Sequence, residues 1–454
     1  MVLALVYMAA FASFGSQARG LLGSEGILPV ERYLPLGPPS LQLFLRAPTL
    51  FWWSRGDLSL LAIAWGGVAL AAVAILAKPH SSWQRSIFGV LYVYYLSIVN
   101  VGQIFMEFQW DFLLLEVGFL AIFVGPDRWR VLLFRLLLFR LMIESGLTKL
   151  LSHDASWINL SALTYHYQTQ PLPTPVAWIA AQLPLWIHKL STATVFLIEL
   201  VLPFFMLGPR RLKQIAGVGT IGLQLLILLT GNYTYFNLLT IGLCLFLFDD
   251  ECLAQLRIRP SYRTTPGRPA NRQVTIVLST VIALVSSAEI WGMFARTPPL
   301  VDSILRAQAS FGIVNRYGLF AVMTTTRSEI EIEGSMDGDT WLPYVFPHKP
   351  GPLGRAPTWI APFQPRLDWQ MWFASLGTAR ENPWFTQLLV RLLEGSKPVL
   401  ALFERAPFGG APPKYIRAMR YRYRFTTADE HRRTGNWWFR ESDGTYFPPA
   451  SLGR

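Results

Sequence analysis

The chain has 454 residues, of which 52% are hydrophobic and 15% charged, and its mean hydropathy is +0.33. Soluble globular proteins carry about 25% charged residues. This depletion, with 30 Phe, 17 Trp and 16 Tyr, excludes a disordered chain, a coiled coil and a cytosolic enzyme, and it predicts a polytopic membrane protein. Two cysteines exclude a disulfide-stapled scaffold and a Cys-rich metal site. Because P-loop, serine-hydrolase and zinc-protease motifs are absent from the sequence, we expect no metal and no cofactor.

Nine apolar segments follow one another through the first two thirds of the chain. Several are shorter than the ~20 residues needed to cross about 30 Å of hydrocarbon, so tilted, half-spanning or re-entrant segments are expected among them. The absence of an internal repeat argues against a transporter. The segments are residues 1–17, 57–77, 83–105, 110–125, 130–151, 191–208, 214–230, 233–248 and 272–297.

The distribution of Lys and Arg in the short loops predicts the orientation of these segments. If the N-terminus is cytosolic and the segments alternate, the cytosolic loops collect 12 basic residues, whereas the short loops 106–110 and 231–235 on the other side hold none. The loops 18–56 and 152–190, and the whole chain after the ninth segment, are therefore expected on the lumenal or periplasmic side. This bias contributes to the net charge of +12, so no nucleic-acid partner is expected.

Residues 298–454 are expected to form a separate non-cytosolic domain after a transmembrane domain of residues 1–297. The alternation in 328–333 predicts a half-buried strand, and Asp337-Gly338 predicts a turn to a partner strand in 340–346. An amphipathic helix is expected at 385–393 and an aromatic and arginine-rich strand at 421–425. The predicted fold class is an α-helical polytopic membrane domain followed by an α+β, β-sandwich-like extramembrane domain.

The fifth apolar segment carries ionisable residues that are costly inside a membrane. Insertion scales assign about 2.5–3.5 kcal/mol to each, so such residues should face a polar interior and have partners. Arg140 and Glu144 are spaced i, i+4 and are predicted to pair, either as a link between helices or as part of an intramembrane site. Lys149, at the far end of the segment, either extends its ammonium to the interface or acts as a base with a depressed pKa.

The stretch after this segment, 157–175, combines three aromatic residues, a histidine and two glutamines before a Pro-rich end. Such a composition is typical of a structured loop at the membrane interface. His166 is therefore either a hydrogen-bonded structural residue or a candidate catalytic residue.

Six longer motifs extend over nearly the whole chain and can be compared with known families. They lie at 146–150, 165–173, 313–327, 334–338, 361–374 and 412–418. The most distinctive are Tyr-His-Tyr-Gln-Thr-Gln-Pro-Leu-Pro at 165–173 and Ala-Pro-Phe-Gln-Pro-Arg-Leu-Asp-Trp-Gln-Met-Trp-Phe-Ala at 361–374. Together they strongly resemble the lipase maturation factor family.

This resemblance implies a multi-pass protein whose eukaryotic members lie in the endoplasmic reticulum membrane and assist the folding of secreted lipases such as lipoprotein lipase. The family offers no established catalytic residue to transfer to this chain. Ala155 stands where a cysteine is common in relatives, which argues against thiol exchange. The compact segments and the lack of an extended tail look bacterial, in which case the chain would lie in the bacterial cytoplasmic membrane.

A fainter resemblance leads to an alternative. Residues 146–150 (Gly-Leu-Thr-Lys-Leu), followed by a tryptophan, are similar to the membrane domain of vitamin K-dependent γ-glutamyl carboxylases. In that family a lysine corresponding to Lys149 is the base that deprotonates a hydroquinone. Thr148 replaces the first lysine of the element, and only about twenty residues carry the likeness.

Two hypotheses about function follow. In the first, the chain is a non-enzymatic maturation factor, anchored in the lipid bilayer, whose exposed aromatic residues hold a secreted, lipase-like client. Trp369, Trp372, Trp437 and Trp438 are the candidates for this contact, unless they are buried in their own domain. In the second, it is an intramembrane enzyme that acts on a quinone-like or lipid substrate with Lys149 as the base. The sequence leaves the client and the oligomeric state open.

Overall fold

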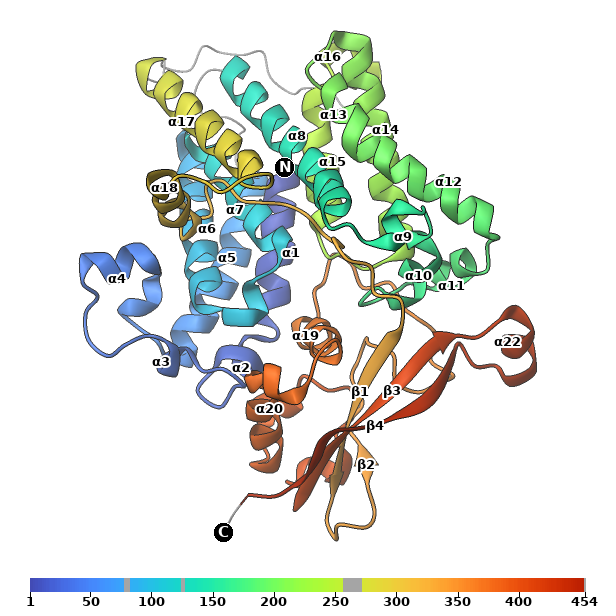
Figure 1. Cartoon of the computed structure of the whole chain (residues 1–454). Coiled ribbons are helices and arrows are strands. Elements are labelled where there is room, and N and C mark those ends of the chain that lie inside the picture. The colour runs from blue at the N-terminus through green and yellow to red at the C-terminus, as the bar shows by residue number, and fades with distance from the viewer. Residues whose placement is uncertain (77–81, 124–126, 256–271, 453–454) are drawn as a thin grey trace.

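The computed structural model describes residues 1–76, 82–123, 127–255 and 272–452. Each of the nine predicted apolar segments contains a helix, and Figure 1 shows these helices gathered in the upper part of the molecule. We call them the helical region. Its long elements are α1 (Val2–Gly15), α5 (Asp57–Leu76), α6 (Ser82–Val101), α7 (Gln109–Phe123), α8 (Asp127–Leu151), α12 (Leu185–Phe196) continuing through a π-helical turn (Leu197–Val201) into α13 (Leu202–Phe205), α14 (Arg210–Thr230), α15 (Phe236–Cys244) and α17 (Arg272–Trp291).

Three of these helices are long and apolar enough to cross a membrane: α5, α14 and the continuous helix Leu185–Phe205. The prediction of a membrane protein is thus supported, whereas nine separate spans are not confirmed. The shorter or more charged helices explain the difference. Helix α1 has 14 residues and α15 has nine, and α8, although it has 25 residues, carries Arg140, Glu144 and Lys149.

Helix α1 lies in the middle of the helical region rather than at its periphery (Figure 1). Its side chains Tyr7, Phe11 and Phe14 are fully buried. Phe11 packs against Tyr95 of α6, with ring centroids 5.2 Å apart, and a Cβ on Gly67 of α5 would stand 2.5 Å from the Phe11 ring. The apolar character of α1 is therefore used for contacts between helices.

Short helices connect the long ones or belong to the rest of the chain. In the first loop they are α2 (Ala18–Leu22), α3 (Val30–Tyr33) and α4 (Leu41–Arg46); later come α9 (Ala155–Ile158), α10 (Ala162–Thr169), α11 (Pro175–Ala181), α16 (Asp250–Gln255) and α18 (Pro299–Ala309).

The C-terminal region, residues 311–452, contains one four-stranded antiparallel sheet of order β2-β1-β3-β4. The strands are β1 (Arg327–Ser335), β2 (Leu342–Pro343), β3 (Tyr415–Phe425) and β4 (Trp438–Ala450). The expected strands at 328–333 and 421–425 are confirmed. The turn at Asp337-Gly338 also connects β1 to a partner strand, but that partner is limited to two residues.

Helices, not a second sheet, accompany this sheet in the described C-terminal residues, so the sandwich-like architecture is not confirmed. They are α19 (Arg366–Ser375), α20 (Pro383–Leu393), α21 (Lys397–Leu400) and α22 (Ala428–Thr434). The predicted amphipathic helix at 385–393 is confirmed as α20, whose apolar side chains are buried and which ends before Gly395 at a φ of +71°.

The buried face of the sheet changes between its two ends. At one end the buried face carries Ile330 and Ile332 of β1, together with Ala418, which pairs with Ile332 from β3. At the other end the opposite face is buried, through Arg327, Glu329 and their neighbours. Both faces are thus covered in part, and polar residues of β1 enter the interior.

Candidate functional site between the helical and C-terminal regions

The C-terminal region contacts the helical region at one end, through four separate loops. Arg391 Nε donates to the Gly26 carbonyl over 2.8 Å, and Trp372 Nε1 donates to Thr169 over 2.8 Å. Asn232 Nδ2 donates to the Thr358 carbonyl over 2.8 Å. Gln370 donates to the Ile104 carbonyl beside the fourth loop. Gly26, Thr169 and Asn232 lie in the loops 18–56, 152–190 and 231–235, and the fourth loop is 106–110. The distribution of basic residues predicted that all four loops lie on the same side of the membrane.

A buried ion pair lies at the centre of this contact. Arg366, at the start of α19, reaches Asp111 of α7 with two nitrogens, each 3.0 Å from a carboxylate oxygen. Tyr235 donates its hydroxyl to the same carboxylate over 2.7 Å, and Tyr95 donates to it as well. All four side chains are 0% exposed. A guanidinium from one region therefore neutralises a carboxylate inside the other.

Beside this pair, Gln364 fixes the extended chain before α19. Its backbone N–H donates to Ser13 Oγ over 2.8 Å, and its side-chain oxygen accepts from Trp110 Nε1 over 2.8 Å. Gln17 accepts from the Arg366 N–H over 2.8 Å. Ser13 of α1 and Gln17 just after it thus satisfy backbone groups of the C-terminal region that would otherwise be buried without partners.

The predicted pair of Arg140 and Glu144 is confirmed, with Arg140 Nε 3.2 Å from a Glu144 oxygen. Sequence reasoning missed the third member, Glu116 of α7, whose carboxylate lies 2.7 Å from Arg140 Nη1. All three side chains are at most 1% exposed. Two carboxylates share one guanidinium, and both have further donors in the C-terminal region.

These donors come from 312–318, a segment without helix or strand that lies along α7 and α8. The Asn315 N–H donates to Glu116 over 3.0 Å, and the Tyr317 N–H donates to Glu144 over 2.8 Å. Arg140 in turn donates to the Asn315 carbonyl. Non-helical backbone packed against apolar helices needs internal partners. The side chains of Glu116, Arg140 and Glu144 supply these hydrogen-bond partners. Their burial is therefore stabilised only when the segment 312–318 is in position.

Lys149 neither extends to solvent nor stands alone. Its side chain is 7% exposed, and its Nζ lies 2.8 Å from a carboxylate oxygen of Glu199. It also lies over the Trp157 ring, 5.4 Å from the centroid. Glu199 belongs to the π-helical turn, and a Cβ on Gly146 would stand 3.1 Å from the Glu199 Cβ. In this structure the ammonium of Lys149 forms a buried ion pair, and the choice between an interfacial and a basic role stays a prediction.

His166 on α10 packs edge-on against Phe320, with centroids 4.7 Å apart, and lies 3.3 Å from the Tyr233 hydroxyl. Burial, with a smaller contribution from the positive charge of Lys149, lowers the pKa of His166 to about 4. The ring is therefore neutral near pH 7. A catalytic role for His166 or Lys149 stays a prediction, which these contacts do not require.

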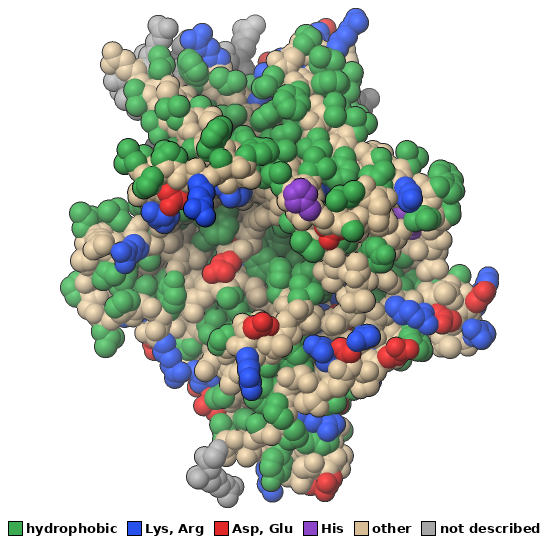
Figure 2. All heavy atoms as spheres, in the orientation of Figure 1, with side chains coloured by type: hydrophobic (Ala, Val, Ile, Leu, Met, Phe, Trp, Pro, Cys, Tyr) green, Lys and Arg blue, Asp and Glu red, His purple; other side chains and the backbone are tan. Residues whose placement is uncertain are grey.

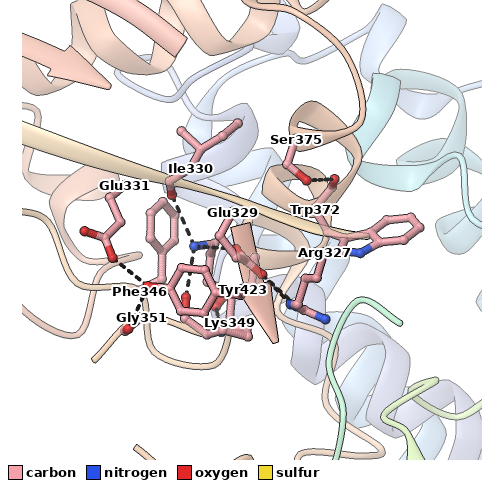
Figure 3. A network of polar contacts seen from close by, with 12 residues as sticks. Arg327, Glu329, Ile330, Glu331, Phe346, Lys349, Gly351, Trp372, Ser375 and Tyr423 are labelled. Atoms are coloured by element: carbon pink, nitrogen blue, oxygen red, sulfur yellow. Dashed lines mark hydrogen bonds and ion pairs between the residues drawn. The ribbon is translucent and has the colours of Figure 1, made fainter. Parts of the chain in front are cut away.

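Figure 3 shows a further buried network at the start of β1. Arg327 lies 2.7 Å from a Glu329 oxygen, and the other oxygen lies 2.8 Å from Lys349 Nζ. Arg327 also donates to the carbonyls of Gln168 and Pro171, over 2.9 and 2.8 Å. Burial lowers the pKa of Arg327, and Glu329 opposes this shift. The network joins the sheet to loop 152–190.

A cavity of about 150 Å³ opens beside this network, between the edge of β1 and residues 343–352. Glu331 in its wall accepts from the Tyr423 hydroxyl over 2.8 Å and pairs with Arg440. Among residues 1–76, 82–123, 127–255 and 272–452, no group of three or more His, Cys, Asp or Glu side chains is placed to hold a metal ion.

Three of the four predicted client-binding tryptophans are buried. Trp369, Trp372 and Trp438 are 3%, 7% and 2% exposed. Trp437 is half-buried and packs against Trp178 of α11, with ring centroids 5.4 Å apart. In this structure the tryptophans stabilise the protein's own contacts, and their client contact stays a prediction.

Comparison with known proteins assigns the chain to a family. Residues 1–255 match the lipase maturation factor transmembrane domain, and residues 313–448 match the lipase maturation factor C-terminal domain. The chain belongs to the lipase maturation factor family. Its predicted domain boundary at 297/298 falls between the two matched ranges and stays a prediction.

Relatives cover nearly the whole chain. Lipase maturation factor 2 from Homo sapiens is 36% identical over 586 aligned positions, which include 99% of this chain and 82% of the relative. Lipase maturation factor 1 from Mus musculus is 33% identical, over 99% of this chain and 86% of the relative. No solved structure matches the chain. Nothing in the comparisons or in the surroundings of Lys149 supports the carboxylase alternative.

Proposed function

We propose that this chain is a membrane-anchored maturation factor that assists the folding of secreted proteins such as lipases. The observation that carries the proposal is the similarity to lipase maturation factors 1 and 2 over 99% of the chain. The buried networks add a physical argument. Asp111, Glu116 and Glu144 bind groups of the C-terminal region, and Lys149 pairs with Glu199 inside the helical region. None of these residues therefore needs a catalytic explanation.

The orientation proposed from the basic residues agrees with the contacts of the C-terminal region. Its partners include Gly26, Thr169 and Asn232, which lie in loops expected on the non-cytosolic side. We therefore propose a cytosolic N-terminus and a lumenal or periplasmic C-terminal region. The compartment would be the endoplasmic reticulum in a eukaryote and the cytoplasmic membrane in a bacterium.

The exposed side of the sheet is the surface we propose for the client. Two arginines of one face lie over aromatic rings there: Arg417 over Trp341 and Arg440 over Tyr421, at 4.2 and 4.4 Å from the ring centroids. Figure 2 shows basic and acidic side chains alternating across this part of the molecule. Arginine and aromatic side chains dominate binding hot spots, and stacked side chains lose little entropy on binding.

Deletion of the gene in its native host, followed by quantitative proteomics of the secreted fraction, tests the proposal. We expect a small set of secreted proteins to be depleted and their precursors to accumulate at the membrane, with restoration by the wild-type gene. Paired Arg417→Ala and Arg440→Ala changes should restore secretion poorly although the variant accumulates normally. An Arg210→Ala control, at an exposed pair with Asp249, should restore it fully. An unchanged secreted proteome would refute the maturation role.

A further inference from the structure

The stretch between α3 and α5, residues 34–56, exposes apolar side chains although it lies outside the candidate membrane-crossing helices. Leu36, Leu41 and Trp53 are 94%, 75% and 68% exposed. Helix α4 within it has no buried residue. Exposed apolar surface of this extent marks a site of contact with another protein or with a membrane.

This stretch is nevertheless held firmly against the helical region. Thr49 Oγ1 donates to the Ser97 carbonyl over 3.0 Å, and the Leu50 N–H donates to Ser97 Oγ over 3.0 Å. Ser97 lies in the last turns of α6, and α5, a candidate membrane-crossing helix, begins at Asp57. Figure 1 shows α4 projecting sideways from the helical bundle, away from β3 and β4.

Helix α18 lies next to the same end of α6. Asn100 Nδ2 donates to the Ser310 carbonyl over 3.1 Å and to the Pro48 carbonyl over 3.5 Å, so it links the two segments. Helix α18 also has no buried residue, and Leu300 and Ile304 are 74% and 49% exposed. We call residues 34–56 together with α18 the lateral shelf.

The charges of the lateral shelf favour one kind of partner, since the acid of α18, Asp302, pairs with Arg306. Residues 34–56 contain Arg46 and Arg55 and no acidic residue. Arg55 turns inward to the carbonyls of Leu34 and Pro35, over 3.0 and 2.7 Å, whereas Arg46 is exposed. Apolar side chains with a basic rim and flanking Trp and Tyr are typical of segments that lie in the membrane interface.

We propose that the lateral shelf is a membrane-interface anchor that lies in the non-cytosolic leaflet beside α5 and α6. Leu36, Leu41 and Leu300 enter the acyl boundary, and Arg46 contacts anionic lipid phosphates. Helix α4 projects from the helical bundle away from the sheet, where we place the client surface (Figure 1). The lateral shelf is therefore assigned to lipid and not to the client. The anchor fixes the height of the C-terminal region above the bilayer.

Spin labels on the full chain test this proposal. Leu36→Cys and Leu41→Cys are labelled in a Cys252→Ser background, in which the remaining Cys244 is buried, and the protein is placed in phosphatidylcholine nanodiscs containing phosphatidylglycerol. We expect the labels to be relaxed more by oxygen than by a water-soluble nickel chelate, at a depth of about 5–10 Å below the headgroups. A label at Thr434→Cys on α22 is the aqueous control and should show the reverse order.

Two outcomes would overturn the proposal. If the labels at 36 and 41 resemble the control at 434, the lateral shelf lies in water. If they are shielded from both reagents, a protein and not lipid covers it. The variant Arg46→Glu separates the electrostatic part: the labels should move towards water in discs with phosphatidylglycerol and remain unchanged in phosphatidylcholine alone.

Discussion

The ion pair of Arg366 and Asp111 is expected to be a principal link between the helical and C-terminal regions. In Arg366→Met the Asp111 carboxylate keeps the hydroxyls of Tyr235 and Tyr95 but loses both guanidinium contacts of 3.0 Å. Breaking a pair that is 0% exposed on both sides costs about 3–5 kcal/mol. This corresponds to a change of about 10²–10⁴ in the unfolding equilibrium, a large part of the stability of an ordinary domain.

The measurement is reversible unfolding in mixed detergent–SDS micelles, followed by tryptophan fluorescence. Asp111→Leu alone should cost a similar amount, because it leaves the guanidinium buried without its carboxylate. The double variant Asp111→Leu, Arg366→Met should recover more than half of the summed loss, since Tyr95 and Tyr235 still bond to each other over 2.6 Å. Arg210→Met is the matched control: its pair with Asp249 is exposed to solvent and should contribute little to stability. An Arg366→Met protein as stable as this control, or a double variant that loses the full sum, would show that the two regions are not joined through this pair.

Three further predictions concern the other buried groups. Glu144→Gln keeps an acceptor for the Tyr317 N–H and should destabilise the protein less than Glu144→Leu in the same SDS titration; equal losses would contradict this role. Lys149→Met should lower stability by about 3–5 kcal/mol by leaving Glu199 unpaired, and adding Glu199→Gln should restore most of it, unless the pair contributes nothing. Because the pKa of His166 is lowered to about 4, the unfolded chain binds more protons between its ordinary value of about 6.5 and pH 4, so stability is lost as the pH falls through this window. Thermal melts at pH 7 and pH 4.5 should show a smaller difference for His166→Gln than for the wild type, and an identical difference would refute the assignment.

Local patterns predicted the elements whose residues interact with near neighbours in sequence. The i, i+4 spacing gave the pair of Arg140 and Glu144, and the apolar spacing in 385–393 gave α20. Both depend on helix geometry alone, which is the same wherever the helix lies.

The partners at long range could not be read from such patterns. The alternation in β1 predicted a half-buried strand, but Glu329 on its polar face is 0% exposed and pairs with both Arg327 and Lys349. The same holds for Glu116 and Glu199. Each is an isolated acid within an apolar segment, so its cost in a membrane signalled a partner. Only the fold shows which basic residue that partner is.

The motifs that resemble the lipase maturation factor family lie mainly where the two regions meet. The segment 313–327 supplies the backbone groups held by Glu116 and Glu144, and 361–374 supplies Arg366 for Asp111. A chain ending at residue 297 would keep the carboxylates of Asp111, Glu116 and Glu144. It would lose the hydrogen-bond donors of the C-terminal region that bind these buried carboxylates. The C-terminal region is therefore part of the same cooperative structure as the helices, and loss of function on its removal would report unfolding as readily as loss of a client surface. Client binding has to be separated from folding by substitutions on the exposed side of the sheet. Arg417 and Arg440 lie over aromatic rings there and contribute little to the contact between the two regions.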